Sequence, residues 1–143
     1  MKENKRKGFT LIELLLAVVI LAVLAAVVVP KFTGRSEEAR ISASKTDISN
    51  IELALDTYEI DMGDYPSDSE GLEALVDEPS GEDEEKWKGP YLKRGVPEDP
   101  WGNEYSYQFP GRHNEYGYDL YSNGPDERGG TDDDIVNWDK DED

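Results

Sequence analysis

The hydrophobic residues of this chain are concentrated near its N-terminus. Residues 9–29 are apolar except for Thr10 and Glu13. A helix rises about 1.5 Å per residue, so a run of this length can cross the roughly 30 Å hydrocarbon core of a membrane. The run is longer than the apolar core of a cleavable secretory signal and contains no Ala-x-Ala site. We therefore predict a membrane-spanning helix over residues 9–29.

The helical pattern continues over residues 30–60. Apolar or small residues recur there at alternating spacings of three and four, namely Ile41, Ser44, Ile48, Ile51, Leu55 and Tyr58. This spacing predicts an amphipathic helix with one buried stripe. A coiled-coil seam is the alternative, but the stripe covers few heptads and Ser44 interrupts it, which favours packing against the chain's own domain. Pro30 lies inside the helical pattern and predicts a kink.

The residues after this helix contain a helix-ending signal and then a helix-starting signal. Gly63 and Pro66 end the helical pattern. Ser67, with Glu70 three residues later, has the spacing of a capping box, in which side chains satisfy the free N–H groups at a helix start. We therefore predict a short second helix over residues 71–76.

The rest of residues 61–143 has the signals of a small domain containing strands. Aromatic runs at residues 105–109 and 116–121 are bounded by Gly, Pro and Asn, a pattern that predicts strands. Together with the helices, these runs predict an α+β fold. In this fold the long N-terminal helix, with its membrane-spanning first half, packs on a small antiparallel sheet.

Charge divides the chain in the same way as hydropathy. The chain carries 33 Asp and Glu against 15 Lys and Arg, a formal net charge of -18, yet basic residues precede the apolar run. Positive charge tends to stay inside, so the N-terminus is expected in the cytoplasm and the domain across the membrane. The acidic surface argues against nucleic acid as a partner. The chain has no Cys, which excludes disulfides and thiolate metal sites.

Glu13 is the carboxylate inside the apolar run. A charged side chain at the centre of a membrane helix costs about 3 kcal/mol on insertion scales unless it finds a partner. Glu13 therefore predicts a positively charged partner. The alternative is an interfacial residue at the start of a simple anchor helix, with its carboxylate reaching toward water.

An acidic loop over residues 122–135 is the candidate metal site. Carboxylates are hard oxygen donors and Gly lets backbone carbonyls turn inward, a combination that favours Ca²⁺ with its about six to eight oxygen ligands. The loop lacks the alternating acids and the closing Glu of an EF-hand. The alternative is a solvated acidic loop without a ligand.

The sequence contains no recognisable catalytic motif. His113, the single histidine, lies in a Pro-Gly-Arg-His-Asn segment and is expected to be an exposed turn residue. There is no Ser or Cys nucleophile motif, phosphate-binding Gly-rich loop or His-Glu metal helix. We therefore expect that the chain is not an enzyme.

The N-terminal segment Arg6-Lys7-Gly8-Phe9-Thr10-Leu11-Ile12-Glu13 resembles the class III signal of type IV pilins and pseudopilins. The resemblance implies that residues 1–8 are a leader and that a prepilin peptidase cuts between Gly8 and Phe9. It further implies that Phe9 becomes N-methylated. In assembly, Glu13 is then expected to meet the N-terminal amine of Phe9 in a neighbouring subunit.

Three further segments, residues 58–75, 89–105 and 118–138, resemble the major pseudopilins of type II secretion. This resemblance implies a single-pass protein of the bacterial inner membrane with a periplasmic C-terminal domain. It implies polymerisation into a periplasmic pseudopilus that drives export of folded proteins. The implied partners are other copies of the chain, minor pseudopilins and an inner-membrane assembly platform.

The acidic loop also resembles the calcium site of major pseudopilins. The resemblance implies that the carboxylates of three residues bind Ca²⁺, namely Asp126, Asp133 and Asp134. It implies that backbone carbonyls of three more complete the site, namely Asn123, Arg128 and Thr131. Glu127 departs from the Gly that is common after the first Asp, so the following turn is expected to differ.

Two other functions are compatible with parts of this pattern. One is a type IV pilin subunit for adhesion, motility or DNA uptake. Such pilins commonly have a Cys pair near the C-terminus, and this chain has no Cys. The other is an anchored calcium-binding module that never polymerises, which would differ from a pseudopilin in keeping its leader.

Overall fold

The computed structural model describes residues 8–80 and 85–140, apart from the side chains of residues 26–34. The predicted leader, except Gly8, therefore lies outside the described residues. The elements in chain order are α1 (Leu11–Met62), the 3-10 helix η1 (Gly71–Leu75), β1 (Ser106–Gln108), β2 (Asp119–Ser122), the 3-10 helix η2 (Gly124–Asp126) and β3 (Ile135–Val136). The chain divides into two compact units, Met1–Glu38 and Ala39–Asp143, which we describe separately.

The N-terminal unit contains the first half of α1. Its large apolar side chains are exposed, from Phe9 at 89% to Leu24 at 55%. Within the residues that the structure describes, no helical stretch combines the length and apolar character needed to cross a membrane. The helix assignment continues through Pro30, but the side chain of Pro30 lies outside the described residues and the kink stays a prediction.

The second half of α1 buries the stripe that its sequence predicts. Ser44, Ile51 and Leu55 are fully buried, Ile48 and Tyr58 nearly so, and Ile41 packs against the edge of the core. Burial of side chains at spacings of three and four is the consequence of about 3.6 residues per helical turn. On the opposite side, Leu53 and Ile60 are exposed. The predicted packing of the helix on its own domain is confirmed.

Glycine ends α1 as the sequence indicates. Gly63 adopts a φ of +93°, and its N–H donates to the Glu59 carbonyl at 2.7 Å. A residue with positive φ closes many helices in this way, and Gly adopts that conformation without a steric penalty.

The predicted second helix is present, but it is a 3-10 helix. The Glu70 carboxylate accepts from the Ser67 N–H at 2.8 Å and from the Ser67 hydroxyl at 2.6 Å. In a full capping box the hydroxyl would accept a backbone N–H instead. Only one half of the capping box therefore forms. The 3-10 helix buries three of its five residues, Leu72, Ala74 and Leu75.

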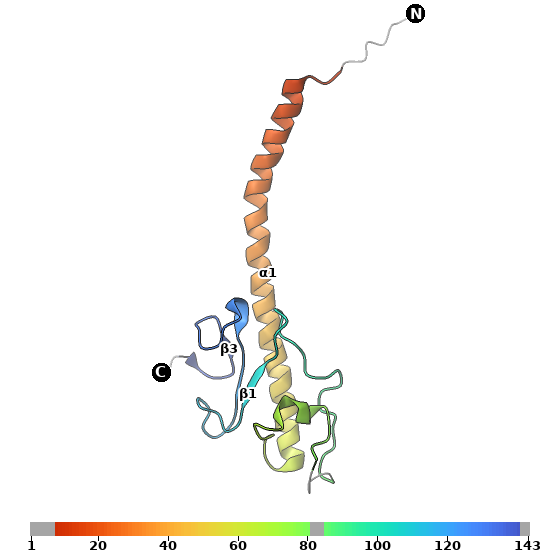
Figure 1. The fold of residues 1–143 in the computed structure, drawn as a ribbon, viewed down its shortest axis with the longest axis vertical. Coiled ribbons are helices and arrows are strands. Elements are labelled where there is room, and N and C mark those ends of the chain that lie inside the picture. Colours follow the sequence, from red (N-terminus) through yellow and green to blue (C-terminus); the bar gives the residue numbers. More distant parts are fainter. Residues whose placement is uncertain (1–7, 81–84, 141–143) are drawn as a thin grey trace, which may run out of the picture. The chain divides into compact units, whose positions relative to one another are not determined.

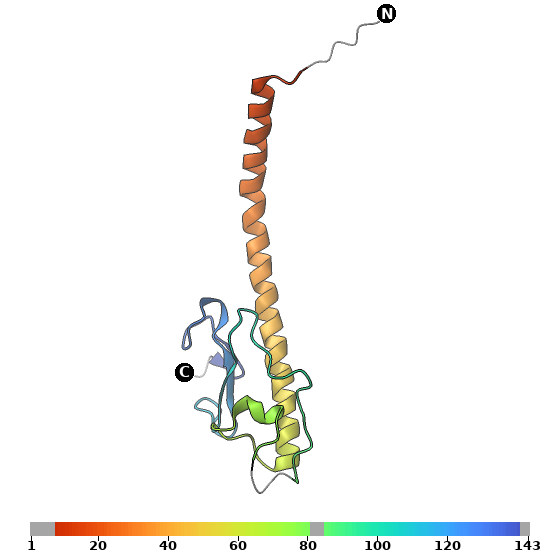
Figure 2. The same cartoon turned by 45° about the vertical axis from the view of Figure 1, so that its right-hand side comes forward.

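The sheet is antiparallel, with strand order β1-β2-β3, and lies along one side of the second half of α1 (Figures 1 and 2). Tyr107 pairs with Leu120 in the centre of the first hairpin. The run predicted at 105–109 contains β1. The run predicted at 116–121 was placed too early, because β2 begins at Asp119 and residues 116–118 belong to the preceding loop. The two-residue strand β3 was not predicted.

The core forms where α1, η1 and the sheet meet. Leu120 from β2, Leu75 from η1 and Leu55 from α1 are all fully buried. Tyr118 adds an aromatic contact with Tyr65, at 4.8 Å between ring centroids in an edge-to-face arrangement. Such a core suffices for one small domain because the helix contributes a full stripe to it.

We expect Leu55→Ala to lower the free energy of unfolding by about 3 kcal/mol, because it leaves a cavity in the core. The matched control is Leu53→Ala on the exposed side of the same helix, which should change it by less than about 0.5 kcal/mol. Urea unfolding of the detergent-solubilised chain, followed by Trp fluorescence, measures both. Equal losses in the two variants would contradict the burial pattern.

Candidate calcium loop and assembly segment

The segment that the sequence marks for assembly begins α1 with a capping box. The Thr10 N–H and hydroxyl donate to the Glu13 carboxylate at 2.9 and 3.0 Å. In return, the Glu13 N–H donates to the Thr10 hydroxyl at 3.4 Å. Glu13 was predicted to need a positively charged partner, yet in the single chain it has neutral donors of its own. The Thr-x-x-Glu spacing is the capping-box signature and could have predicted this contact.

The proposed cleavage site lies just before this box. Gly8 and Phe9 are both exposed. A Cβ atom added at Gly8 would meet no other atom within 4 Å. The bond between them is therefore accessible. Neither Gly8 nor Phe9 belongs to a helix or strand, since α1 begins at Leu11.

The acidic loop is closed at its base by strand pairing. Ser122 at the end of β2 pairs with Ile135 at the start of β3, so residues 123–134 leave and rejoin the sheet at one place. Glu127 follows η2 with a φ of 57°, in the left-handed region. Glycine adopts this region most easily, so Glu127 adopts it at some cost in backbone strain.

Three of the six predicted ligand residues converge within the loop. The Asp134 carboxylate is 9% exposed as a residue and accepts the Gly130 N–H at 2.7 Å. The Thr131 hydroxyl lies 3.4 Å from the other oxygen of Asp134 and 3.2 Å from the Arg128 carbonyl. A buried carboxylate, a hydroxyl and a carbonyl oxygen therefore share one side of the loop. The hydroxyl is not the donor predicted for Thr131, whose carbonyl accepts the Asp134 N–H at 3.3 Å.

The other predicted carboxylates are not gathered with Asp134. Asp126 is exposed and accepts the Arg128 N–H at 3.0 Å, and Asp133 is exposed. Over residues 8–80 and 85–140, no three Asp, Glu or His side chains lie close enough to hold a metal together. The donor chemistry of the loop, all oxygen, fits Ca²⁺, but its carboxylates are dispersed.

The side chain of Asn123 lies across the loop from Gly129. Its side-chain oxygen faces Gly129 across the loop, 3.2 Å from the place where a Cβ would be. A side chain at position 129 would therefore push Asn123 away. The predicted role of Asn123 as a carbonyl ligand stays a prediction.

Asp119 is a buried carboxylate that the sequence did not reveal. It is 3% exposed, and it accepts the backbone N–H groups of residues 112–114, at 2.8 Å from Arg112 and 3.0 Å from Asn114. Burial by itself raises the pKa of Asp119, but these N–H groups and the His113 ring outweigh burial and hold the pKa below its usual value. Asp119 thereby fixes the loop between β1 and β2.

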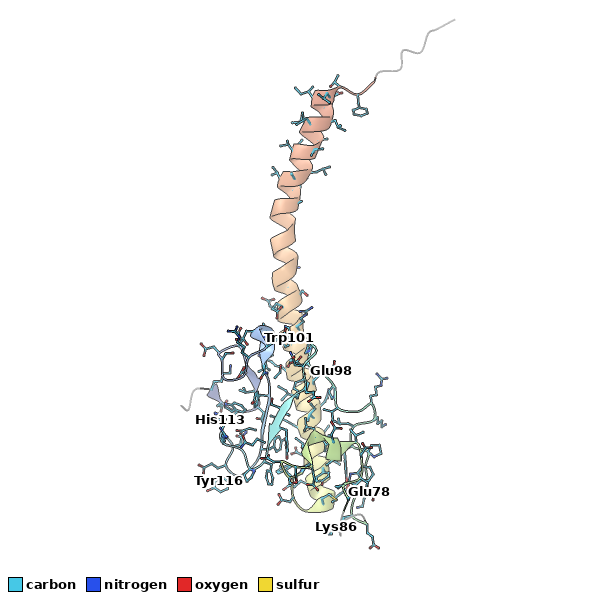
Figure 3. All side chains as sticks on the ribbon, in the orientation of Figure 1. Glu78, Lys86, Glu98, Trp101, His113 and Tyr116 are labelled. Carbon is cyan, nitrogen blue, oxygen red and sulfur yellow. The ribbon has the colours of Figure 1, made fainter. Side chains whose placement is uncertain are left out.

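His113 joins this loop to the C-terminal segment. Its Nδ1 lies 3.0 Å from the Asp119 carboxylate, and its ring stacks on Trp138 at 4.1 Å between centroids. The predicted exposed position is confirmed, and Figure 3 shows His113 and Tyr116 on the same side of the domain. The stacking on Trp138 makes His113 a packing residue as well.

Comparison with known families gives two matches that together cover nearly the whole chain. Residues 31–138 match the family described as "Type II secretion system (T2SS), protein G". Residues 4–29 match the "Prokaryotic N-terminal methylation motif". The second match covers the segment in which Gly8, Phe9 and Glu13 lie.

Individual relatives agree with these families. The chain is 48% identical to the type II secretion system core protein G of Pseudomonas aeruginosa, over 97% of this chain and 99% of the relative. It is 44% identical to the core protein G of Escherichia coli K12, over 94% and 92%. The crystal structure of the major pseudopilin from the type 2 secretion system of enterohaemorrhagic Escherichia coli matches with a TM-score of 0.60 and 35% identity, over 78% of this chain and 96% of that one. The pilin-like fold is therefore confirmed.

We expect Asp119→Asn to lower the free energy of unfolding by about 2 kcal/mol at pH 7, because the N–H groups lose a charged acceptor. The folded-state pKa lies below the unfolded one, so the ionised carboxylate stabilises the fold above the unfolded value of about 3.9. This contribution is lost as pH falls through the folded pKa.

The difference between wild type and Asp119→Asn should therefore shrink on acidification below about pH 4. Urea unfolding at several pH values measures it. The matched control is Glu115→Gln, which removes an exposed charge from the same loop and should have little effect. A difference that stays constant with pH would contradict the role of the charge.

Proposed function

The chain belongs to the protein G family of type II secretion systems, the family of the major pseudopilins, and we propose that its two units serve separate steps of pseudopilus assembly. As a major pseudopilin, the chain is a subunit of the secretion machinery. The N-terminal unit is proposed to hold the subunit in the membrane and then in the filament core. The second unit is proposed to form the outer part of the periplasmic filament.

The observation that carries this proposal is the exposed apolar surface at the start of α1. Large side chains from Phe9 to Leu24 are each at least half exposed. Soluble monomers rarely expose contiguous apolar patches beyond a few hundred Å². Lipid would cover this surface before assembly. The same helix in other copies of the chain would cover it after assembly.

The exposed apolar surface also bears on where the chain lies and what it binds. We propose a single pass through the inner membrane over residues 9–29, with the second unit in the periplasm. Minor pseudopilins and an inner-membrane assembly platform are the proposed partners besides other copies of the chain. The relatives described above are secretion-system proteins, which favours this function over the type IV pilin alternative. A structural subunit of this kind needs no catalytic residue.

Leader removal is proposed to prepare the assembly contact. A prepilin peptidase would cut between Gly8 and Phe9, and the new amine of Phe9 would be N-methylated. In the filament, the amine of a neighbouring copy would replace the neutral donors of Thr10 at the Glu13 carboxylate. A cationic amine would add a Coulomb attraction to the carboxylate that the neutral Thr10 donors lack, so the exchange favours assembly.

Calcium is the proposed ligand of the acidic loop. Arg128, Thr131 and Asp134 already share one side of the loop, and Asp126, Asp133 and Asn123 are the proposed remaining ligands. The bound ion would offset the mutual repulsion of the carboxylates that it draws together. Because the ion binds the folded loop, it would stabilise the second unit by mass action.

We expect calcium at about 100 times its Kd to raise the thermal midpoint of the solubilised chain by on the order of 10 °C. Asp133→Ala should lose most of this rise. Asp133 is exposed, so the variant should match the wild type without calcium. The matched control is Asp139→Asn, an exposed acid beyond the loop, which should keep the full response. A wild type that does not respond to calcium would remove the calcium proposal.

We expect Glu13→Gln to be processed normally but to form few filaments, because the amide cannot pair with a cationic amine. Mass spectrometry of the mature N-terminus reports processing, and electron microscopy of sheared fibres reports assembly. Glu38→Gln, which removes an exposed acid farther along the same helix, is the control and should assemble like the wild type. Normal fibres from Glu13→Gln would contradict the proposed charge pair.

A further inference from the structure

The base of the acidic loop is tied to a second turn of the domain. Ser122, where the loop begins, is fully buried and pairs with Ile135, where the loop ends. Its hydroxyl donates to the Asp99 carboxylate at 2.6 Å. Asp99 belongs to the turn 97–103, which precedes β1 in the chain and contributes none of the predicted calcium ligands.

Asp99 is buried and uses both oxygens of its carboxylate. One oxygen accepts the backbone N–H groups of Trp101 and Asn103, at 3.0 and 2.9 Å, and the other accepts the Ser122 hydroxyl. Asp99 is 4% exposed, so the charge is stabilised by these donors rather than by water.

The contact continues from Ser122 into the loop. The Ser122 hydroxyl accepts the Gly124 N–H at 3.1 Å. Gly124 has a φ of +65° and packs so closely on the Asp133 carbonyl that any side chain at 124 would collide with it. A continuous series of contacts therefore runs from Asp99 through Ser122 and Gly124 to the backbone of Asp133.

This series bears on the dispersed carboxylates of the loop. A cation can gather them only by ordering the loop, which costs conformational entropy. Contacts that already fix part of the loop backbone lower this cost. The backbone pairing of Ser122 with Ile135 fixes the two ends of the loop, and the Ser122 hydroxyl, held by Asp99, helps to fix Gly124 against the Asp133 carbonyl. They do so from outside the ligand set, since the oxygens of Asp99 are occupied by N–H and O–H donors.

We propose that Asp99, acting through the Ser122 hydroxyl, is a positioning residue for calcium binding by the acidic loop. The proposal rests on the proposed calcium function. Under this proposal the turn 97–103 and the acidic loop are coupled. Calcium binding at the loop stabilises the turn, and an ordered turn strengthens calcium binding. Such coupling is reciprocal by thermodynamic necessity.

The test is calcium titration of the full chain in detergent by calorimetry, well below the thermal midpoint of each variant. Ser122→Ala removes the link while leaving the backbone pairing and every predicted ligand, and it should bind calcium about tenfold more weakly than wild type. Asp99→Asn should weaken binding to a similar extent, and the double variant should be no weaker than either single one. Glu98→Gln, an exposed acid beside Asp99, is the matched control and should bind as the wild type does.

Hydrogen exchange supplies a readout that a merely structural role would not change. Calcium should slow exchange of the Trp101 and Asn103 amides in the wild type, although both lie outside the loop, and it should not do so in Ser122→Ala. Wild-type affinity in Ser122→Ala, or slowing of these amides in both proteins, would overturn the coupling while leaving calcium binding in place. A wild type that binds no calcium would overturn the calcium function and the coupling with it.

Discussion

Carboxylates that accept backbone N–H groups hold together the irregular segments of this domain. Among the residues that the structure describes, its sheet has three short strands, so most of those after α1 have no ladder partner for their backbone. Asp99 and Asp119 each accept several N–H groups from such a segment, and Asp134 accepts one. Buried N–H groups without a partner are costly, and a charged acceptor satisfies several at once. The three acids thus replace the regular hydrogen bonding that a larger sheet would provide.

The large elements could be predicted from the sequence because each follows from a periodic pattern. The stripe from Ile41 to Tyr58 identified the face of α1 that is buried, and Gly63 marked its end. The aromatic run around Tyr107 located β1. Strand β3 could not be predicted, because two residues are too short to show an alternation and their pairing is set by the position of Ser122 across the sheet.

The acids that organise the loops could not be separated in the sequence from the many others. With 33 Asp and Glu in the chain, nothing local distinguishes buried Asp119 from exposed Glu115. Their roles depend on contacts between segments that only the fold brings together, as with Asp99 and Ser122. The capping box of Thr10 and Glu13 is different, because its spacing is local and legible in the sequence. For the candidate calcium loop, the sequence predicted the donor types, while the arrangement of Arg128, Thr131 and Asp134 required the structure.

The loop between β1 and β2 has its ends fixed by the pairing of Gln108 with Asp119 and its backbone held from inside by the Asp119 carboxylate. Its tip, at Glu115 and Tyr116, is exposed to solvent and contributes neither to the strand pairing nor to the hydrogen bonds of Asp119. The entropic cost of closing a loop rises only slowly with its length. Over evolutionary time, the tip can therefore vary in sequence and length without disturbing the sheet, and it is a suitable place for a related chain to acquire a surface of its own.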